Sequence, residues 1–219
     1  MSRFTQRHLD PASRLGEILF GLIMVLAVTL TAAFAVDDGK KGVHQLLCAA
    51  IGSNVAWGVI DAVMYIMNCL IVRRGKLRLI QRVQNMSDAN SALALVRDEV
   101  DPELQELLSP KEAEAFRKSV LKSIAGAQVA EIILTKEDLR GALACFWLVF
   151  VSCLPAALPF LFFSQPSLAL RISNVLLIAA LFYVGQKWAQ YAGRSRVAIG
   201  SAMVAVGLAL VGVTILLGG

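Results

Sequence analysis

Residues 43–72 read VHQLLCAAIGSNVAWGVIDAVMYIMNCLIV, a nearly unbroken apolar run that contains one carboxylate, Asp61. The run is long enough for a tilted helix across a hydrocarbon core about 30 Å thick. A carboxylate at this depth is costly to insert and normally faces a bundle interior or a watery pathway. The stretch therefore predicts a membrane span with a candidate functional site at Asp61.

Asp61 has an asparagine seven residues away on either side, Asn54 and Asn68. Seven residues are almost two helical turns, so the three side chains are expected on one face of the helix. Gly58 and Met64, each three residues from Asp61, are expected on that face as well. A functional site is one interpretation of the pattern. The other is structural, with the carboxyl and the two amides joining helices through hydrogen bonds.

The composition is that of a membrane protein. Of its 219 residues, 57% are hydrophobic and 17% charged. The net charge of +5 does not indicate a nucleic-acid partner, because the basic residues gather at the ends of apolar runs and instead signal membrane orientation. All four cysteines lie within apolar runs, where packing is their usual role. The polar start of the chain does not resemble a signal peptide, so we expect the first span to be retained.

The apolar runs predict an all-α integral membrane protein with five transmembrane helices and a cytoplasmic helical insertion between the second and third. Its expected parts are a transmembrane hairpin (1–78), the insertion (79–138) and the last three spans (139–219). The expected spans are Leu15–Val36, Val43–Val72, Gly141–Ser164, Ile172–Tyr191 and Val197–Gly219.

Basic turns set the expected orientation. RRGKLR (Arg73–Arg78) and AGRSR (Ala192–Arg196) should lie in the cytoplasm by the positive-inside rule, together with the N-terminus. The turn DDGKKG (Asp37–Gly42) then lies outside. We expect a bacterial inner membrane in preference to an organelle membrane, although both would show the same bias.

The first span repeats the seven-residue spacing, with Glu17, Met24 and Thr31. Both of the first two spans thus carry a chemically distinctive stripe. Glu17 also has a simpler interpretation, as an interfacial carboxylate near a helix N-terminus that pairs with Arg14.

The insertion holds 11 of the 16 acidic residues, mixed with Lys and Arg. Asp101-Pro102 and Ser109-Pro110 each predict the start of a helix. Faces of mixed charge are normally solvated, so solvated helix charge is the preferred interpretation of the glutamates here. These are Glu99, Glu103, Glu106, Glu112 and Glu114.

The third span contains Pro155 and Pro159, which should free backbone carbonyl groups near Val151 and Pro155. Carbonyl groups freed inside a membrane need partners. A metal ion, a hydroxyl such as that of Ser152, and a simple kink are the three interpretations.

The order of parts resembles the vacuolar iron transporter family. SCLPAALPF (152–160) is similar to that family's proline-rich third span, and ALFYVGQKWAQYAGRSRVAIGSAMVAVGLALVGVTILLG (180–218) to its last two. EILFG (17–21) and AAIGSNVAWG (49–58) are similar to the openings of its first two spans. The resemblance implies a homodimeric, proton-driven exporter or sequestering antiporter for Fe²⁺ or Mn²⁺.

Two departures concern the transport pathway. Where the family's first span carries Asn-Asp-Gly, this chain reads Ile23-Met24-Val25, so a thioether replaces the pathway aspartate. The family's second-span Gly-Glu-Tyr corresponds to Gly58 followed by Asp61, a carboxylate displaced by about two residues. That displacement turns a side chain by roughly 200° around a helix.

The sequence and this resemblance together predict a transporter of divalent transition metals, and not an enzyme, in a lipid bilayer and without a resident cofactor. The resemblance implies a second copy of the chain as a further partner. Asp61 is the expected hard, proton-coupled ligand. The other candidate ligands are the thioethers of Met24 and Met64, the amides of Asn54 and Asn68, and Glu17. Mixed carboxylate, amide and thioether donors suit Fe²⁺ or Mn²⁺ better than Ca²⁺ or Mg²⁺. The alternative is a non-transporting scaffold or regulatory protein that retains the fold.

Overall fold

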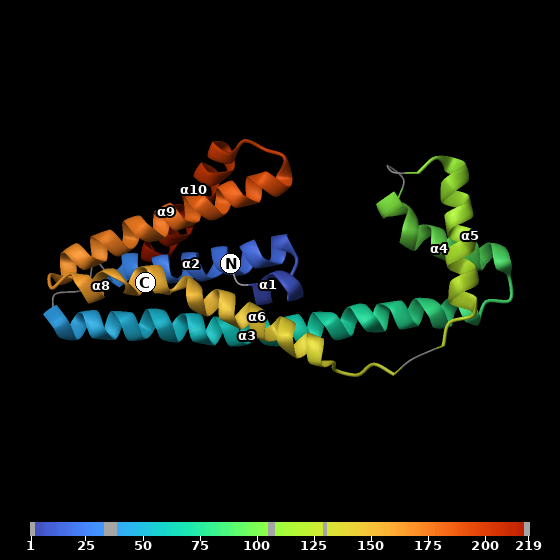
Figure 1. The fold of residues 1–219 in the computed structure, drawn as a ribbon, viewed down its shortest axis with the longest axis horizontal. Coiled ribbons are helices and arrows are strands. Elements are labelled where there is room, and N and C mark those ends of the chain that lie inside the picture. Colours follow the sequence, from blue (N-terminus) through green and yellow to red (C-terminus); the bar gives the residue numbers. More distant parts are fainter. Residues whose placement is uncertain (1–2, 33–38, 105–107, 129–130, 217–219) are drawn as a thin grey trace. The chain divides into compact units, whose positions relative to one another are not determined.

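The structure is a computed structural model that describes residues 3–32, 39–104, 108–128 and 131–216. These ranges contain helices and no strand (Figure 1). The helices are α1 (Arg3–His8), α2 (Pro11–Ala32), α3 (Gly39–Gln84), α4 (Ala89–Leu104), α5 (Pro110–Ala125), α6 (Lys136–Ser152), α7 (Leu154–Ala157), α8 (Pro159–Phe162), α9 (Pro166–Ala192) and α10 (Arg196–Leu216).

Within the described ranges, five helical stretches are long and apolar enough to cross a membrane, which confirms the predicted fold class. They are Pro11–Leu30, Gly42–Gln84, Lys136–Phe162, Pro166–Ala192 and Arg196–Val213. The chain is therefore a multi-pass membrane protein. The second stretch extends past the predicted end at Val72, because the basic residues that follow continue the helix instead of ending it.

The chain forms two compact units. Residues 1–66 and 135–219 make up the first, which we call the membrane unit. Residues 67–134 make up the second, the insertion unit. Helix α3 contributes its first part to the membrane unit and its last part to the insertion unit.

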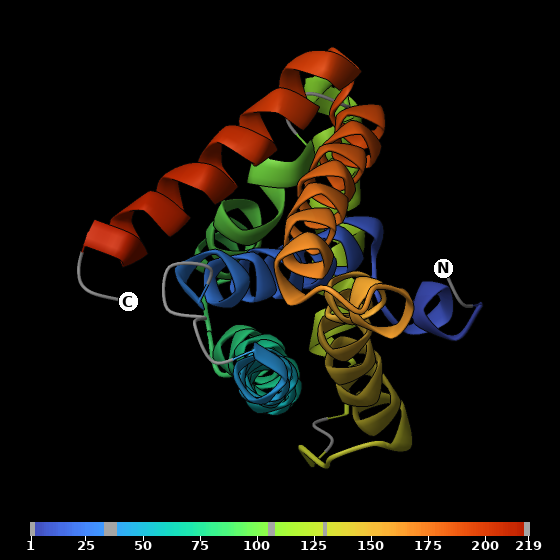
Figure 2. The same ribbon diagram turned by 90° about the vertical axis from the view of Figure 1, so that its left-hand side faces the viewer.

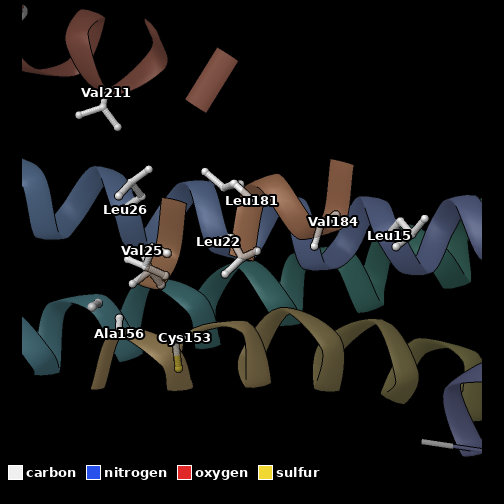
Figure 3. Close-up of a cluster of buried hydrophobic side chains, with 11 residues drawn as sticks. Leu15, Leu22, Val25, Leu26, Cys153, Ala156, Leu181, Val184 and Val211 are labelled. Atoms are coloured by element: carbon white, nitrogen blue, oxygen red, sulfur yellow. The ribbon is translucent and has the colours of Figure 1, made fainter. Parts of the chain in front are cut away.

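The core of the membrane unit lies where α2, α9, α10 and α7 meet. Leu22 and Leu26 of α2 pack with Leu181 of α9, and Val211 of α10 belongs to the same cluster (Figure 3). All four side chains are at most 2% exposed. Lipid tails are as apolar as leucine, so this contact is stabilised by close packing more than by the hydrophobic effect.

Helices α9 and α10 approach closely at two glycines. A Cβ atom on Gly185 would lie 2.8 Å from the Cα atom of Gly200, and one on Gly200 would lie 2.7 Å from the ring of Phe182. The turn between the two helices begins at Gly193, whose φ of 62° is a left-handed conformation that glycine adopts at low cost. Small residues and this turn therefore set the approach of the last two spans.

The third span is broken at its prolines. Helix α6 ends at Ser152, and the short helices α7 and α8 begin next to Pro155 and at Pro159. Figure 2 shows α3 nearly end-on, with α2 and α6 beside it. This break lies at the level where α6 meets Asn54 of α3.

The insertion unit contains the helical hairpin α4–α5 and a small core around Val83, Ala92 and Val96. Helix α5 begins as predicted, with Ser109 and Glu112 forming a reciprocal capping box. The helix start predicted at Asp101-Pro102 is wrong. Helix α4 instead begins after Asp88, whose carboxylate accepts hydrogen bonds from the backbone of Asn90 and Ser91, and it continues through Asp101.

Asp101 joins the two helices of the hairpin. Its Oδ1 lies 2.6 Å from Nε of Arg117 on α5, and its Oδ2 lies 3.3 Å from Nε of Arg97 on α4. The hydrogen bonds from Arg117 hold the pKa of the Asp101 carboxyl below its usual value. A side chain expected to start a helix thus holds two helices together.

Candidate functional site

The candidate site is a contact between the first two spans and the third. The carboxyl groups of Glu17 on α2 and Asp61 on α3 lie in hydrogen-bond contact, and the thiol of Cys145 on α6 donates a hydrogen bond to Glu17. A hydrogen bond between two carboxyl groups requires a proton on one of them, because two adjacent carboxylates repel each other. The pair therefore holds a proton while the contact is intact.

Asp61 Oδ2 is a buried atom of this contact. Among the described residues it accepts no hydrogen bond from a nitrogen or hydroxyl donor. A buried, unsatisfied carboxylate oxygen is costly, and a cation or a donated proton is what such an atom accepts.

Two turns along α3, the fully buried Asn54 makes a second contact between the same three helices. Its amide donates hydrogen bonds to the carbonyl oxygen of Val149 (2.8 Å) and to Oγ of Ser152 (3.2 Å) on α6. A longer hydrogen bond of 3.4 Å reaches the carbonyl oxygen of Gly21 on α2. We call Glu17, Asn54, Asp61 and Cys145 the polar seam.

The carbonyl group of Val149 is available because the helix tightens ahead of the prolines. The backbone amide of Cys153 donates to Phe150, three residues back, and not to Val149. Ser152 Oγ then donates to the oxygen of Val149 at 2.6 Å, beside the amide of Asn54. The prolines predicted freed carbonyl groups near Val151 and Pro155, whereas this one belongs to Val149. Its partners are side-chain donors, and a hydroxyl such as that of Ser152 was one of the three interpretations.

One further turn along α3 from Asp61, Tyr65 contacts the N-terminal helix α1. Its hydroxyl donates a hydrogen bond of 3.4 Å to the carbonyl oxygen of His8. Gly141 of α6 makes room for this ring, because a Cβ atom there would lie 2.3 Å from the tyrosine oxygen. His8 Nδ1 lies 3.0 Å from Oε2 of Glu137, which ties α1 to the start of α6.

Of the six predicted site residues, the structure brings Asp61 and Glu17 into contact, and it places Asn54 in a separate contact between the same helices. Glu17 contacts Asp61 and Cys145, whereas the simpler interpretation paired it with Arg14. Among the ion pairs of the described residues, no Arg14–Glu17 pair occurs.

The other three predicted ligands lie apart from the polar seam. Met64 is 60% exposed, and Asn68 is also exposed. Met24 is half-buried on α2, two turns from Glu17. Gly58, by contrast, packs against Phe146 of α6, so the buried face of α3 lies on the Gly58 side of Asp61 and not on the Met64 side.

The described residues of one chain do not form a complete metal shell. In the described ranges, no three His, Cys, Asp or Glu side chains are arranged to hold a metal ion. Sequence reasoning had treated Cys145 as a packing residue and had not considered Tyr65. Cysteine and tyrosine in apolar spans carry no pattern that distinguishes a polar contact from packing.

The insertion glutamates agree with solvated charge where the structure describes them. Glu112 belongs to the capping box of α5, and Glu114 lies 2.7 Å from Nζ of Lys118. Glu99 is exposed. Glu106 and the side chain of Glu103 lie outside the described residues, as do the first two residues of the predicted Asp37–Gly42 turn.

Comparison with known proteins identifies the family. The model of the VIT family matches residues 76–219, which are more than half of the chain. A search of curated protein sequences found no match to the chain. The matched range includes Cys145, Val149 and Ser152 of the third span and begins after Glu17, Asn54 and Asp61. The chain therefore belongs to the VIT family, whose members are membrane transporters of divalent metals and not enzymes.

Proposed function

We propose that this protein moves Fe²⁺ or Mn²⁺ out of the cytoplasm in exchange for protons, with the polar seam as its central binding step. The contact between Glu17 and Asp61 carries the proposal. Binding of a divalent cation to the pair has to displace the proton that the two carboxyl groups share, so metal and proton compete for the same atoms. Alternating occupancy by the two ions is the chemical requirement for an antiporter.

The donor set supports a transition metal. Glu17 and Asp61 carry hard oxygen atoms and Cys145 carries a soft sulfur atom, although within the described part of one chain the three are not arranged as a metal shell. Ca²⁺ and Mg²⁺ prefer shells made entirely of oxygen, whereas Fe²⁺ and Mn²⁺ accept mixed ones. The proposed orientation has the N-terminus in the cytoplasm of a bacterial inner membrane, in agreement with the basic residues at 73–78 and 192–196.

We further propose that two copies of the chain complete the site. In the most apolar 18-residue segment of α3, only 6% of the residues are buried by the rest of the chain. Met64 and Asn68 lie on the exposed part of this helix, so they reach a bound ion only if another chain covers that face. A homodimer would supply the ligands that one chain lacks.

Ion flux into proteoliposomes tests the transport proposal. Purified protein should give saturable uptake of Fe²⁺ or Mn²⁺ that rises with an imposed pH gradient, and Asp61→Asn should reduce it to the level of empty vesicles. Asp98→Asn, which neutralises an exposed carboxylate of the insertion unit, is the matched control and should leave uptake unchanged. Full uptake by folded Asp61→Asn protein would contradict the mechanism.

A cysteine at Met64 tests the dimer separately. With Cys48 and Cys69 of α3 replaced by serine, oxidation of Met64→Cys in membranes should give a covalent dimer, whereas a cysteine at the buried position Leu22 should not. If Met64→Cys stays monomeric under the same oxidation, the exposed face of α3 contacts lipid and the two-chain site is wrong.

A non-transporting scaffold is the second candidate. Met24 stands where the resemblance expects a pathway aspartate, and the family match begins only at residue 76. This reading predicts that uptake of Fe²⁺, Mn²⁺, Zn²⁺ and Ca²⁺ by folded, dimeric protein equals that of empty vesicles.

A further inference from the structure

A cavity of about 440 Å³ lies in the membrane unit, on a side of α2 different from the polar seam. Residues of α1, α2, α6, α7 and α9 line it, and Glu17, Asn54 and Asp61 are not among its lining residues in the described chain. Its volume falls within the range of about 300–1,000 Å³ that is usual for sites of small organic ligands. The transport proposal assigns it no role.

Two cations line this cavity. Arg14 is only 8% exposed, and its side-chain Nε has no hydrogen-bond partner in the described part of the chain. Nζ of Lys187 lies 5.5 Å from the centre of the Tyr183 ring, which also lines the cavity. The described lining contains no Asp or Glu. A buried cation without a counter-charge is costly, so the cavity is built for an anion.

The rest of the lining is apolar and is ordered along the helices. On α2, Arg14 is followed into the span by Ile18 and Leu22, and on α9, Lys187 is preceded by Val184 and Ala180. The cations thus lie at one end of the cavity, and aliphatic side chains extend from them toward the middle of the spans. This end is the predicted cytoplasmic end of both helices.

Part of the cavity's lining reaches the surface of the chain. Tyr183 is 58% exposed and Trp147, which also lines it, is 48% exposed, and both belong to spans. A ligand can therefore enter from the lipid phase.

We propose that this cavity binds one anionic phospholipid of the cytoplasmic leaflet. The phosphate group accepts hydrogen bonds from Arg14 and contacts Lys187, and an acyl chain lies along the wall that includes Ile18 and Ala180. Free phosphate matches the cations but leaves the apolar wall uncovered. A zwitterionic lipid carries a cation of its own toward Lys187, so an anionic headgroup is preferred.

Native mass spectrometry of the detergent-purified full chain tests this site, with phosphatidylglycerol, phosphatidylcholine and inorganic phosphate as probes. Phosphatidylglycerol should be retained at one molecule per chain, and Lys187→Gln should weaken its binding about fivefold, the usual effect of one basic side chain near an anionic leaflet. Arg196→Gln removes an exposed cation at the start of α10 and should not change retention. Arg14→Gln should weaken binding at least as much as Lys187→Gln, and if it does not fold, Lys187→Gln carries the test.

A second variant separates lipid from free anion. Ala180→Phe fills the apolar wall and should reduce retention of phosphatidylglycerol while leaving any binding of inorganic phosphate unchanged. Three results would overturn the proposal: equal retention of phosphatidylcholine, an equal loss in Arg196→Gln, or displacement of the lipid by inorganic phosphate at matched concentration. The last would identify a free-anion site.

Discussion

The side-chain amide of Asn54 donates a hydrogen bond of 2.8 Å to the carbonyl oxygen of Val149. The bond joins α3 to the end of α6, where the backbone has lost its regular helical partner. The Asn54 amide supplies a hydrogen bond that the backbone amide of the next turn donates in a regular helix. The second span is thus connected to the third by a polar contact inside otherwise apolar packing.

Asn54→Leu should destabilise the membrane unit. The substitution removes the donors to Val149, Ser152 and Gly21, and we expect a loss of about 1–2 kcal/mol, because Val149 keeps its hydrogen bond from Ser152. Thermal unfolding in detergent measures the change. Asn68→Leu, on the exposed part of the same helix, should have little effect, and equal losses in the two variants would argue against the contact.

Gly21→Ala should destabilise α2 against α6. A Cβ atom at Gly21 would lie 2.9 Å from the carbonyl oxygen of Val149 and closer still to Oγ of Ser152. Overpacking of this kind costs about 1–3 kcal/mol. Gly16→Ala, on the same helix with no neighbouring atom within 4 Å, is the control and should be neutral or slightly stabilising. Thermal unfolding of both variants decides, and equal stability of the two would show that α2 does not approach α6 this closely.

Glu17→Gln and Asp61→Asn should not have additive effects on metal affinity. The two carboxyl groups share a proton and contact each other, so each single variant already removes the pair that a cation would bridge. We expect the double variant to bind Fe²⁺ or Mn²⁺ about as weakly as Asp61→Asn alone. Titration calorimetry measures the three affinities. Losses that add in full would mean that the carboxyl groups act at separate sites.

The α4–α5 hairpin should lose stability in acid. Hydrogen bonds from Arg117 lower the pKa of Asp101 below its ordinary value of 3.8 in the folded chain. The unfolded chain then binds a proton more readily than the folded one, so this contribution is complete above the ordinary value and is lost as the pH falls toward the lowered pKa. Hydrogen exchange of 89–104 and 110–125 in the full chain, followed from pH 7 to pH 3, should show the loss.

Two arginine variants assign that effect. Arg117→Met should flatten the acid dependence, since Arg117 provides the first and largest cause of the lowered pKa. Arg97→Met should change it less, because the Arg97 side chain is 64% exposed and its nearest contact is longer. If both variants lose hairpin stability in acid as the native chain does, carboxyl groups other than that of Asp101 cause the loss.

Much of the membrane topology could be predicted from sequence, because a bilayer requires long apolar helices and basic turns mark their ends. The end of the second span could not. Charge at Arg73 indicates where a helix leaves the lipid, but it does not end the helix, and Val83 is instead buried in the core of the insertion unit. The polarity of its residues indicates where a helix contacts lipid or water, but it does not indicate where the helix ends.

The contacts of the candidate site residues could be predicted only in part, because spacing along one helix does not show which neighbouring helix a face meets. Seven-residue spacing placed Asn54 and Asp61 on one face, and the structure turns that face toward α2 and α6. The spacing predicted Gly58 and Met64 on that face as well, but only Gly58 packs against α6, and Met64 is exposed. Periodicity fixes which residues share a face, whereas the direction of that face depends on the neighbouring helices.

The contact between Gly185 and Gly200 has a consequence for how this protein can change. When a larger side chain enters an ordinary helix contact, a smaller residue opposite can restore the fit. Here neither partner has a side chain left to reduce, and the two atoms nearest to a Cβ on Gly185 are backbone atoms of α10. A substitution at Gly185 therefore has no compensating substitution at Gly200, and only a movement of α9 away from α10 can relieve it.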